Sequence, residues 1–250
     1  MYKKAFLNSL LMMIIGISPI MFIVIEVILD PEQKYTTVLS TIPFFIGGIL
    51  CSFYMKEKYN IKLKDYLNKP NGKISLYTIL TAIFYTIVVL YVVNRPTLTG
   101  SPDGTFLEYL TILMASTLAP IGEELIFRFS MLTLLLIAAT NNKKLSYISI
   151  VIISVLWMIV HFTSNPLRMI DIISVGIITG FVYYKTKNIL YPIVFHVIAN
   201  VCTYSSLYVY NWFFEREYIL YIDIILLLFS LIMLLKSLNI ENENSFSRKI

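Results

Sequence analysis

The ten residues from Pro120 to Phe129, PIGEELIFRF, place two adjacent glutamates and an arginine inside an apolar run that extends from residue 106 to residue 139. An apolar run of about 20 residues or more predicts a helix that crosses a membrane. An ionisable side chain inside such a helix costs about 2.5–3.5 kcal/mol on insertion. Charges retained there predict a functional site, so this stretch indicates both the fold class and the place where chemistry is expected.

The composition of the whole chain supports a membrane protein. The 250 residues are 58% hydrophobic, the mean hydropathy is +0.76, and only 14% of the residues are charged. Soluble domains carry about 25% charged residues, and a chain of this size has a surface that must be covered with polar groups in water. The net charge of +5 does not indicate a nucleic-acid partner, because the lysines fall in short segments between apolar runs. Two cysteines, Cys51 and Cys202, lie in apolar segments and predict no disulfide framework.

Eight apolar runs are candidates for membrane helices and predict an all-α fold. Pro120 and Gly122 interrupt the fourth run just before the glutamates, so this run predicts either one kinked helix or two pieces, with the break at these residues. The sixth run is short and also fits a half-buried helix, so totals of seven or nine helices stay open. The runs cover residues 5–29, 37–55, 74–93, 106–139, 146–163, 171–184, 188–210 and 218–235.

The placement of Lys and Arg favours eight spans with both termini in the cytoplasm, because positive residues concentrate in cytoplasmic loops. With eight spans the inner segments hold fifteen Lys and Arg, the outer segments hold four, and Arg128 lies in the membrane. A single fourth span is preferred, since splitting it would move four inner lysines outside: Lys143, Lys144, Lys185 and Lys187. The lysine-rich loop 56–73 is expected to meet anionic membrane lipid.

Helical geometry divides the three charges of the opening stretch. Residues four apart share a helix face, so Glu124 and Arg128 are expected to form an ion pair. Glu123 is five residues from Arg128, a rotation of roughly 140°, and therefore points elsewhere. Pairing partly offsets the cost of burying Glu124 and Arg128. The free carboxylate of Glu123 must then find its partner on another helix.

The only two histidines, His161 and His196, both lie in apolar runs. His196 and Asn200 are four apart and share a face, and Trp157 precedes His161 by the same spacing. Three helices could therefore bring together a carboxylate, two imidazoles and an amide. Such a set provides a base that activates water and donors that hold an oxyanion, which is what hydrolysis requires.

Structural interpretations compete with this one. A histidine in a membrane helix equally fits an interhelical hydrogen bond. Two glutamates that follow Pro and Gly also fit a helix start, where acidic residues are favoured by the helix dipole. Asp171 lies near a predicted span end, where a structural or interfacial role is expected.

In order along the chain, the three motifs resemble those of the CAAX prenyl endopeptidase and bacteriocin-processing (Abi, CPBP) intramembrane protease family. They are Glu123-Glu124-Leu-Ile-Phe-Arg128, Trp157-Met-Ile-Val-His161 and His196-Val-Ile-Ala-Asn200. The second motif of that family usually opens with Phe, and Trp157 keeps an aromatic residue there. The resemblance covers residues 106–210 as a catalytic core. It follows N-terminal membrane helices with the lysine-rich loop (1–105) and precedes a last membrane helix with a polar tail (211–250).

The resemblance implies an eight-span helical fold with a polar catalytic cavity in the bundle. It implies that Glu123 and His161 activate water, that His196 and Asn200 stabilise the oxyanion, and that Glu124 and Arg128 hold the site together, with Trp157 as further support. An obligatory metal is not expected. Zinc stays possible, with Glu123, His161 and His196 as its ligands, because two histidines and a glutamate form a set that catalytic zinc uses.

The expected function is an intramembrane endopeptidase, a multi-pass protein of a bacterial plasma membrane. It would cleave a membrane-associated protein or peptide precursor, in bacteriocin or pheromone processing or in self-immunity. Two alternatives stay open: a non-catalytic immunity or scaffold protein that binds a toxin or a membrane partner, and a proton-coupled transporter. The span limits raise one difficulty, because they place His161 near the outer end of the fifth helix and Glu123 in the middle of the fourth. Tilting of the fifth helix, or its continuation towards Pro166, would bring the two together.

Overall fold

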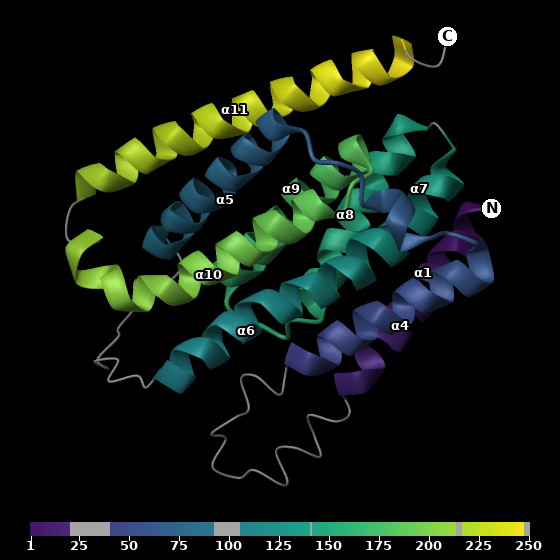
Figure 1. The fold of residues 1–250 in the computed structure, drawn as a ribbon, viewed down its shortest axis with the longest axis horizontal. Helices are drawn as coiled ribbons and strands as arrows, with labels where there is room; N and C mark the ends of the chain where they lie inside the picture. Colours follow the sequence, from purple (N-terminus) through teal and green to yellow (C-terminus); the bar gives the residue numbers. More distant parts are fainter. Residues whose placement is uncertain (21–40, 93–105, 141, 214–216, 248–250) are drawn as a thin grey trace, which may run out of the picture.

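The computed structural model describes residues 1–20, 41–92, 106–140, 142–213 and 217–247 (Figure 1), and every regular element among them is a helix. Eight helical segments follow one another, in agreement with the number predicted. They are α1 (Tyr2–Ile17) with the short η1 (Ser18–Ile20), α4 (Thr41–Tyr59), α5 (Gly72–Val92), the continuous α6–η3–α7, α8 (Lys143–Ile159), α9 (Pro166–Thr186), α10 (Leu190–Phe213) and α11 (Glu217–Ser247). A short 3₁₀ helix, η2 (Leu63–Tyr66), lies between α4 and α5.

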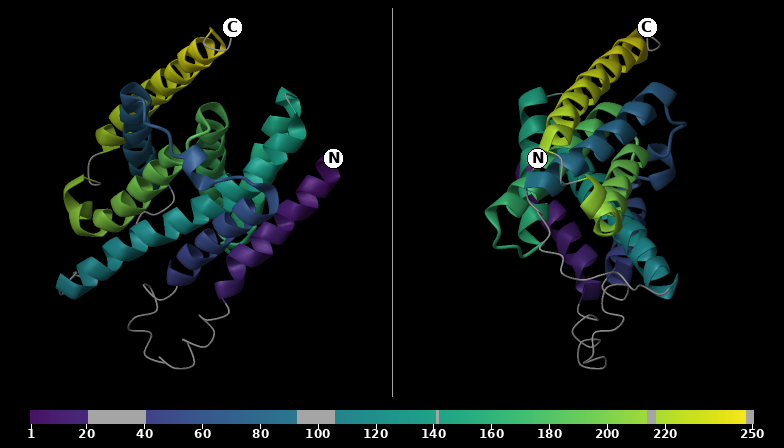
Figure 2. Two further views of the ribbon diagram at one scale, coloured as in Figure 1. Left: turned by 45° about the vertical axis from the view of Figure 1, so that its right-hand side comes forward. Right: turned by 90° about the vertical axis from the view of Figure 1, so that its left-hand side faces the viewer.

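The fourth segment is the centre of the bundle (Figures 1 and 2). Its first part packs between α4 and α10, and its second part contacts α1, α4 and α8. On the far side of α10, α5 packs against α10 and α11, and α8 pairs with α9. The charged motif of the opening stretch is therefore enclosed by helices from all parts of the chain.

The long apolar run 106–139 forms one uninterrupted rod of α6 (Phe106–Glu124), η3 (Leu125–Leu132) and α7 (Thr133–Ala139). The preference for one segment is confirmed, but the expected break at Pro120 is wrong, because Pro120 lies inside α6. The irregularity follows the glutamates instead, since η3 is a π-helical segment. The hydroxyls of Ser130 and Thr133 donate to carbonyls five residues earlier, at 2.8 and 3.3 Å. Segments of this type often occur at functional sites.

Gly122 serves helix packing. A Cβ atom on Gly122 would lie 2.2 Å from the carbonyl oxygen of Phe44 in α4, and one on Gly48 would lie 2.8 Å from the carbonyl oxygen of Gly122. Small residues let the backbones of two membrane helices approach closely. The glycines therefore set the distance between α4 and α6.

In the part of the chain that the structure describes, three helices are long and apolar enough to cross a membrane: α5, α9, and Leu220–Asn239 within α11. A shorter apolar stretch, Leu190–Thr203, lies in α10. Of the other predicted spans, α8 has 17 residues and the α6–α7 rod carries the charged motif. Residues 21–29 and 37–40 of the first two predicted runs lie outside the described residues. The crossing of all eight helices and the cytoplasmic termini remain predictions.

The sixth predicted run, 171–184, was too short. α9 extends from Pro166 to Thr186, and Asn165 caps it by accepting hydrogen bonds from the backbone N–H groups of Leu167 and Arg168. An Asn at the N-cap followed by Pro at the first helical position is a strong helix start. This signal allows α9 to begin with polar residues, which hydropathy alone assigns to a loop.

Candidate active site

The hairpin of α7 and α8 brings Glu123 and His161 to the same depth. Glu123 precedes Ala139, the last residue of α7, by sixteen residues, and His161 follows Lys143, the first residue of α8, by eighteen, the last two of them in the turn after α8. Because the two helices run in opposite directions from one turn, similar residue counts correspond to similar depths. The expected mismatch between the two residues is therefore absent. It arose from comparing the centre of a long run with the end of a short one.

His161 lies in the turn that follows α8 and faces Glu123. Its Nδ1 is 2.8 Å from the backbone oxygen of Trp157. Because a carbonyl oxygen can only accept, Nδ1 carries the hydrogen, and in the neutral ring Nε2 has the free lone pair. Nε2 lies 3.8 Å from Oε2 of Glu123. This separation is too long for a direct hydrogen bond and suits a bridging water.

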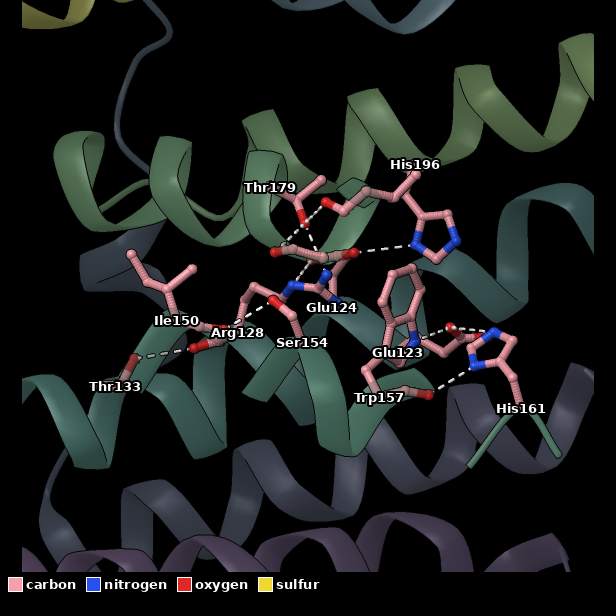
Figure 3. Close-up of polar contacts among 12 residues, drawn as sticks. Glu123, Glu124, Arg128, Thr133, Ile150, Ser154, Trp157, His161, Thr179 and His196 are labelled. Carbon is pink, nitrogen blue, oxygen red and sulfur yellow. Dashed lines mark hydrogen bonds and ion pairs between the residues drawn. The ribbon is translucent and has the colours of Figure 1, made fainter. Parts of the chain in front are cut away.

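Trp157 is a direct partner of Glu123 (Figure 3). Its indole N–H donates to Oε2 of Glu123 over 2.6 Å, and both side chains are buried. The sequence motif indicates only an aromatic support at this position. A phenylalanine at this position could not make the bond, so the tryptophan adds a polar contact that the motif alone does not reveal.

The predicted pair of Glu124 and Arg128 is confirmed, and the structure adds His196 to it. Arg128 Nε lies 3.1 Å from Glu124 Oε2, and both side chains are almost fully buried. Nδ1 of His196 lies 3.0 Å from the other carboxylate oxygen, Oε1. Arg128 Nη2 donates to Thr179 Oγ1 over 2.7 Å. Such additional hydrogen bonds are what a buried ion pair needs.

The indole ring of Trp157 joins the two halves of the site. The guanidinium carbon of Arg128 lies 4.4 Å from the ring centroid. Arg128 Nη1 has no hydrogen-bond acceptor in the described part of the chain, and the aromatic face adds a cation–π contact to the ion pair that Arg128 makes with Glu124. The imidazoles of His161 and His196 meet the indole edge-on, with centroid distances of 5.0 and 5.1 Å.

A cavity of about 310 Å³ lies in front of these residues. Five predicted site residues line it together: Glu123, Trp157, His161, His196 and Asn200. Glu124 and Arg128 are absent from the lining and lie behind it, as expected for supporting residues.

The sequence does not single out three charged or phenolic lining residues as site residues: Tyr85, Arg168 and Asp171. The hydroxyl of Tyr85 donates to Asp171 Oδ1 over 2.9 Å, and Arg168 forms an ion pair with Asp171. The spacing of three residues between Arg168 and Asp171 could have indicated that pair. No local signal marks Tyr85, which comes from another helix.

The geometry distinguishes between the structural interpretations of the two glutamates and of the histidines. The two glutamates lie at the end of α6, where the rod continues into η3, so the helix-start interpretation is wrong. The interhelical hydrogen bond expected of a histidine is present between His196 on α10 and Glu124 on α6. It does not exclude chemistry, because His196 also lines the cavity.

The described residues do not fit a three-ligand metal site. Among them no group of three His, Cys, Asp or Glu side chains is close enough to hold one ion. In this arrangement Nδ1 of His196 contacts Glu124, whereas Nε2 of His161 faces Glu123. The three zinc ligands considered from the sequence thus belong to two separate contacts.

A known protein family matches the segment of the chain that carries the site residues. Residues 105–202 match the sequence profile of the family described as type II CAAX prenyl endopeptidase, Rce1-like. The matched segment contains all three motifs, which confirms the family resemblance and supports a CAAX-type intramembrane protease. Searches of curated proteins and of solved structures gave no match.

Proposed function

We propose that this protein is an intramembrane endopeptidase that hydrolyses a peptide bond with water activated by Glu123 and His161. The observation that supports this most is the gap of 3.8 Å between Glu123 Oε2 and His161 Nε2, at the wall of a cavity inside the helix bundle. A water on the cavity side of these two atoms, at hydrogen-bonding distance from both, can donate one hydrogen to the carboxylate and the other to the imidazole. Its oxygen then keeps a lone pair directed away from both.

In the reaction, the water oxygen attacks the carbonyl carbon of the substrate while Glu123 takes the proton. The proton then passes to the leaving nitrogen as the carbon–nitrogen bond breaks, which gives a carboxylic acid and an amine. General-base catalysis of this kind contributes about 10²–10⁴-fold to a rate. His161 holds the water through Nε2, and its Nδ1–H bond to Trp157 O fixes the ring.

His196 and Asn200 are assigned to the oxyanion. With Nδ1–H donated to Glu124, His196 can donate from Nε2 only as the imidazolium ion, and the carboxylate of Glu124 stabilises that charge. The amide of Asn200, one turn further along α10, is the second donor. Preorganised donors of this kind commonly provide the largest share of transition-state stabilisation.

Trp157 holds the carboxylate of Glu123 in place. Hydrogen bonds to an ionised acceptor are short and roughly twice as strong as those between neutral groups. No step of this mechanism requires a metal ion. The substrate is a membrane-associated protein or peptide precursor. The proposed role of the protease is the processing of a bacteriocin or pheromone, or self-immunity.

Two alternatives are a non-catalytic immunity or scaffold protein and a proton-coupled transporter. Neither would need a carboxylate base and a histidine placed so that one water can bridge them, as Glu123 and His161 are. The test compares the peptides of cells that carry wild type with those of cells that carry Glu123→Gln, by mass spectrometry. A precursor that accumulates in the variant, with its fragment present only in wild type, supports the protease. Identical peptide sets at equal protein levels would reject it.

A further inference from the structure

The lysines that the structure describes gather at one end of the bundle. The turn between α9 and α10 contacts the segment that follows α4, since Ile189 N donates to Tyr66 O over 2.9 Å. The N-terminus lies beside the second turn of α8, where the Tyr2 hydroxyl is 2.8 Å from Ser149 Oγ. The start of α1, the end of α7 and the C-terminal end of α11 lie towards the same end in Figure 1.

Every lysine that the structure describes belongs to this end. Lys236 is included, because its neighbours Leu234 and Leu238 pack with Ile74 at the start of α5. The two described arginines are elsewhere: Arg128 is buried in the site and Arg168 lies at the start of α9. The lysines are Lys3, Lys4, Lys56, Lys58, Lys62, Lys64, Lys69, Lys73, Lys143, Lys144, Lys185, Lys187 and Lys236.

The cavity lies at the opposite end of the same helices. Its lining includes Thr41, the first residue of α4, and Val89, near the end of α5. It also includes His161, just after α8, and Arg168, in the first turn of α9. Each of these four helices carries lysines at or beside its other terminus.

Exposure shows which part of the cavity is the mouth. The side chains of Glu123 and His196 are 9% and 7% exposed, whereas those of His161 and Arg168 are 28% and 40% exposed. Access therefore increases towards the turn between α8 and α9, at the end where none of the described lysines lies.

The depth of Glu123 agrees with this direction. Lys143 and Lys144 begin α8 directly after the turn from Ala139, and lysines that flank an apolar helix are expected at the membrane boundary. Glu123 precedes Ala139 by sixteen residues, a rise of roughly 24 Å, and the hydrocarbon layer is about 30 Å thick. With the boundary at these lysines, the carboxylate falls in the half of the membrane remote from them.

We infer that the catalytic cavity opens on the extracytoplasmic face, and that the substrate class is a peptide whose scissile bond has been exported across the membrane. Lysines are retained in the cytoplasm, where anionic lipid headgroups attract them, so the mouth, opposite to all the described lysines, faces outwards. The substrate class rests on the proposed function, whereas the direction of the mouth does not. Precursors that remain wholly in the cytoplasm are excluded as substrates.

The test measures the labelling of single cysteines by a membrane-impermeant maleimide, in a Cys51→Ser, Cys202→Ser background. Ser164→Cys places an exposed thiol in the turn between α8 and α9, and Lys144→Cys is its matched control in the α7–α8 hairpin. We expect intact cells to label Ser164→Cys and to label Lys144→Cys only after permeabilisation. Labelling of Lys144→Cys in intact cells, or protection of Ser164→Cys until permeabilisation, overturns the inference. Each thiol is first shown to react in detergent.

The labelling needs no activity, and it is repeated with Glu123→Gln added. If the expected labelling appears but no peptide depends on Glu123, the proposed function fails and the orientation holds. If labelling is reversed while a Glu123-dependent fragment is formed, the protease stands and its substrate is cytoplasmic.

Discussion

The indole nitrogen of Trp157 lies 2.6 Å from Oε2 of Glu123, and the same carboxylate oxygen lies 3.8 Å from Nε2 of His161. One oxygen atom therefore accepts a fixed hydrogen bond on one side and faces the proposed water on the other. The bond limits rotation of the carboxylate, which keeps the gap to His161 constant. Several consequences of this arrangement can be measured.

Replacing Trp157 by Phe removes the N–H group but keeps an aromatic ring against His161, His196 and Arg128. A hydrogen bond to a charged group contributes about 1.5–3 kcal/mol, so we expect kcat/KM to fall by roughly 10–100-fold. The level of folded protein in the membrane should be unchanged. Trp157→Ala serves as the comparison, since it also removes the packing and should lower that level. A Trp157→Phe protein as active as wild type would show that the bond has no catalytic effect.

Neutralising Glu124 alone should destabilise the fold, because it leaves Arg128 charged in a buried position. Breaking one partner of a buried pair typically costs about 3–5 kcal/mol. We therefore expect Glu124→Gln to unfold at a lower temperature in detergent and to accumulate poorly. The double variant Glu124→Gln, Arg128→Met, which carries neither charge, should recover part of the loss. Equal stability of the single and double variants would contradict the role assigned to the pair.

Gly122→Ala should weaken the contact between α4 and α6. The added Cβ would meet a backbone oxygen at 2.2 Å, which cannot move without shifting α4, and overpacking typically costs about 1–3 kcal/mol. Gly72→Ala is the matched control, since a Cβ at that position meets nothing within 4 Å. Thermal unfolding in detergent should separate the two variants, and equal unfolding temperatures would disprove the packing role.

Chelation should leave the activity of the purified protein unchanged. The described donors do not form a group of three around one point, and the proposed mechanism uses the carboxylate and imidazole directly. The measurement is kcat/KM before and after dialysis against a chelator, with metal analysis of the same preparation. Loss of activity that is restored by adding zinc would require a different arrangement of His161 and His196.

Local spacing explains what could be predicted from the sequence. Residues four apart share a helix face whatever surrounds them, so the pair of Glu124 and Arg128 and the isolation of Glu123 followed from helical geometry. The three motifs identified the cavity residues because their chemistry is rare in apolar helices. The number of helical segments followed from hydropathy.

Contacts between helices could not be predicted in this way. The bond from His196 to Glu124 and the position of Tyr85 depend on how α6, α10 and α5 pack, which no local pattern records. The π-helical segment after Glu124 could not be predicted either, because no residue pattern within it marks the change of helix type. Pro120 was a stronger local signal than anything within Leu125–Leu132, yet the break it favoured did not occur.

The most direct test of the central claim uses purified protein in detergent and the precursor that accumulates in Glu123→Gln cells. Wild type, Glu123→Gln and His161→Gln are incubated with this precursor, and the products are identified by mass spectrometry. We expect wild type to cut one peptide bond without any ion gradient, and both variants to fall to the uncatalysed rate while remaining folded. Cleavage by either variant at the wild-type rate, or the absence of cleavage by folded wild type, would contradict activation of water by Glu123 and His161.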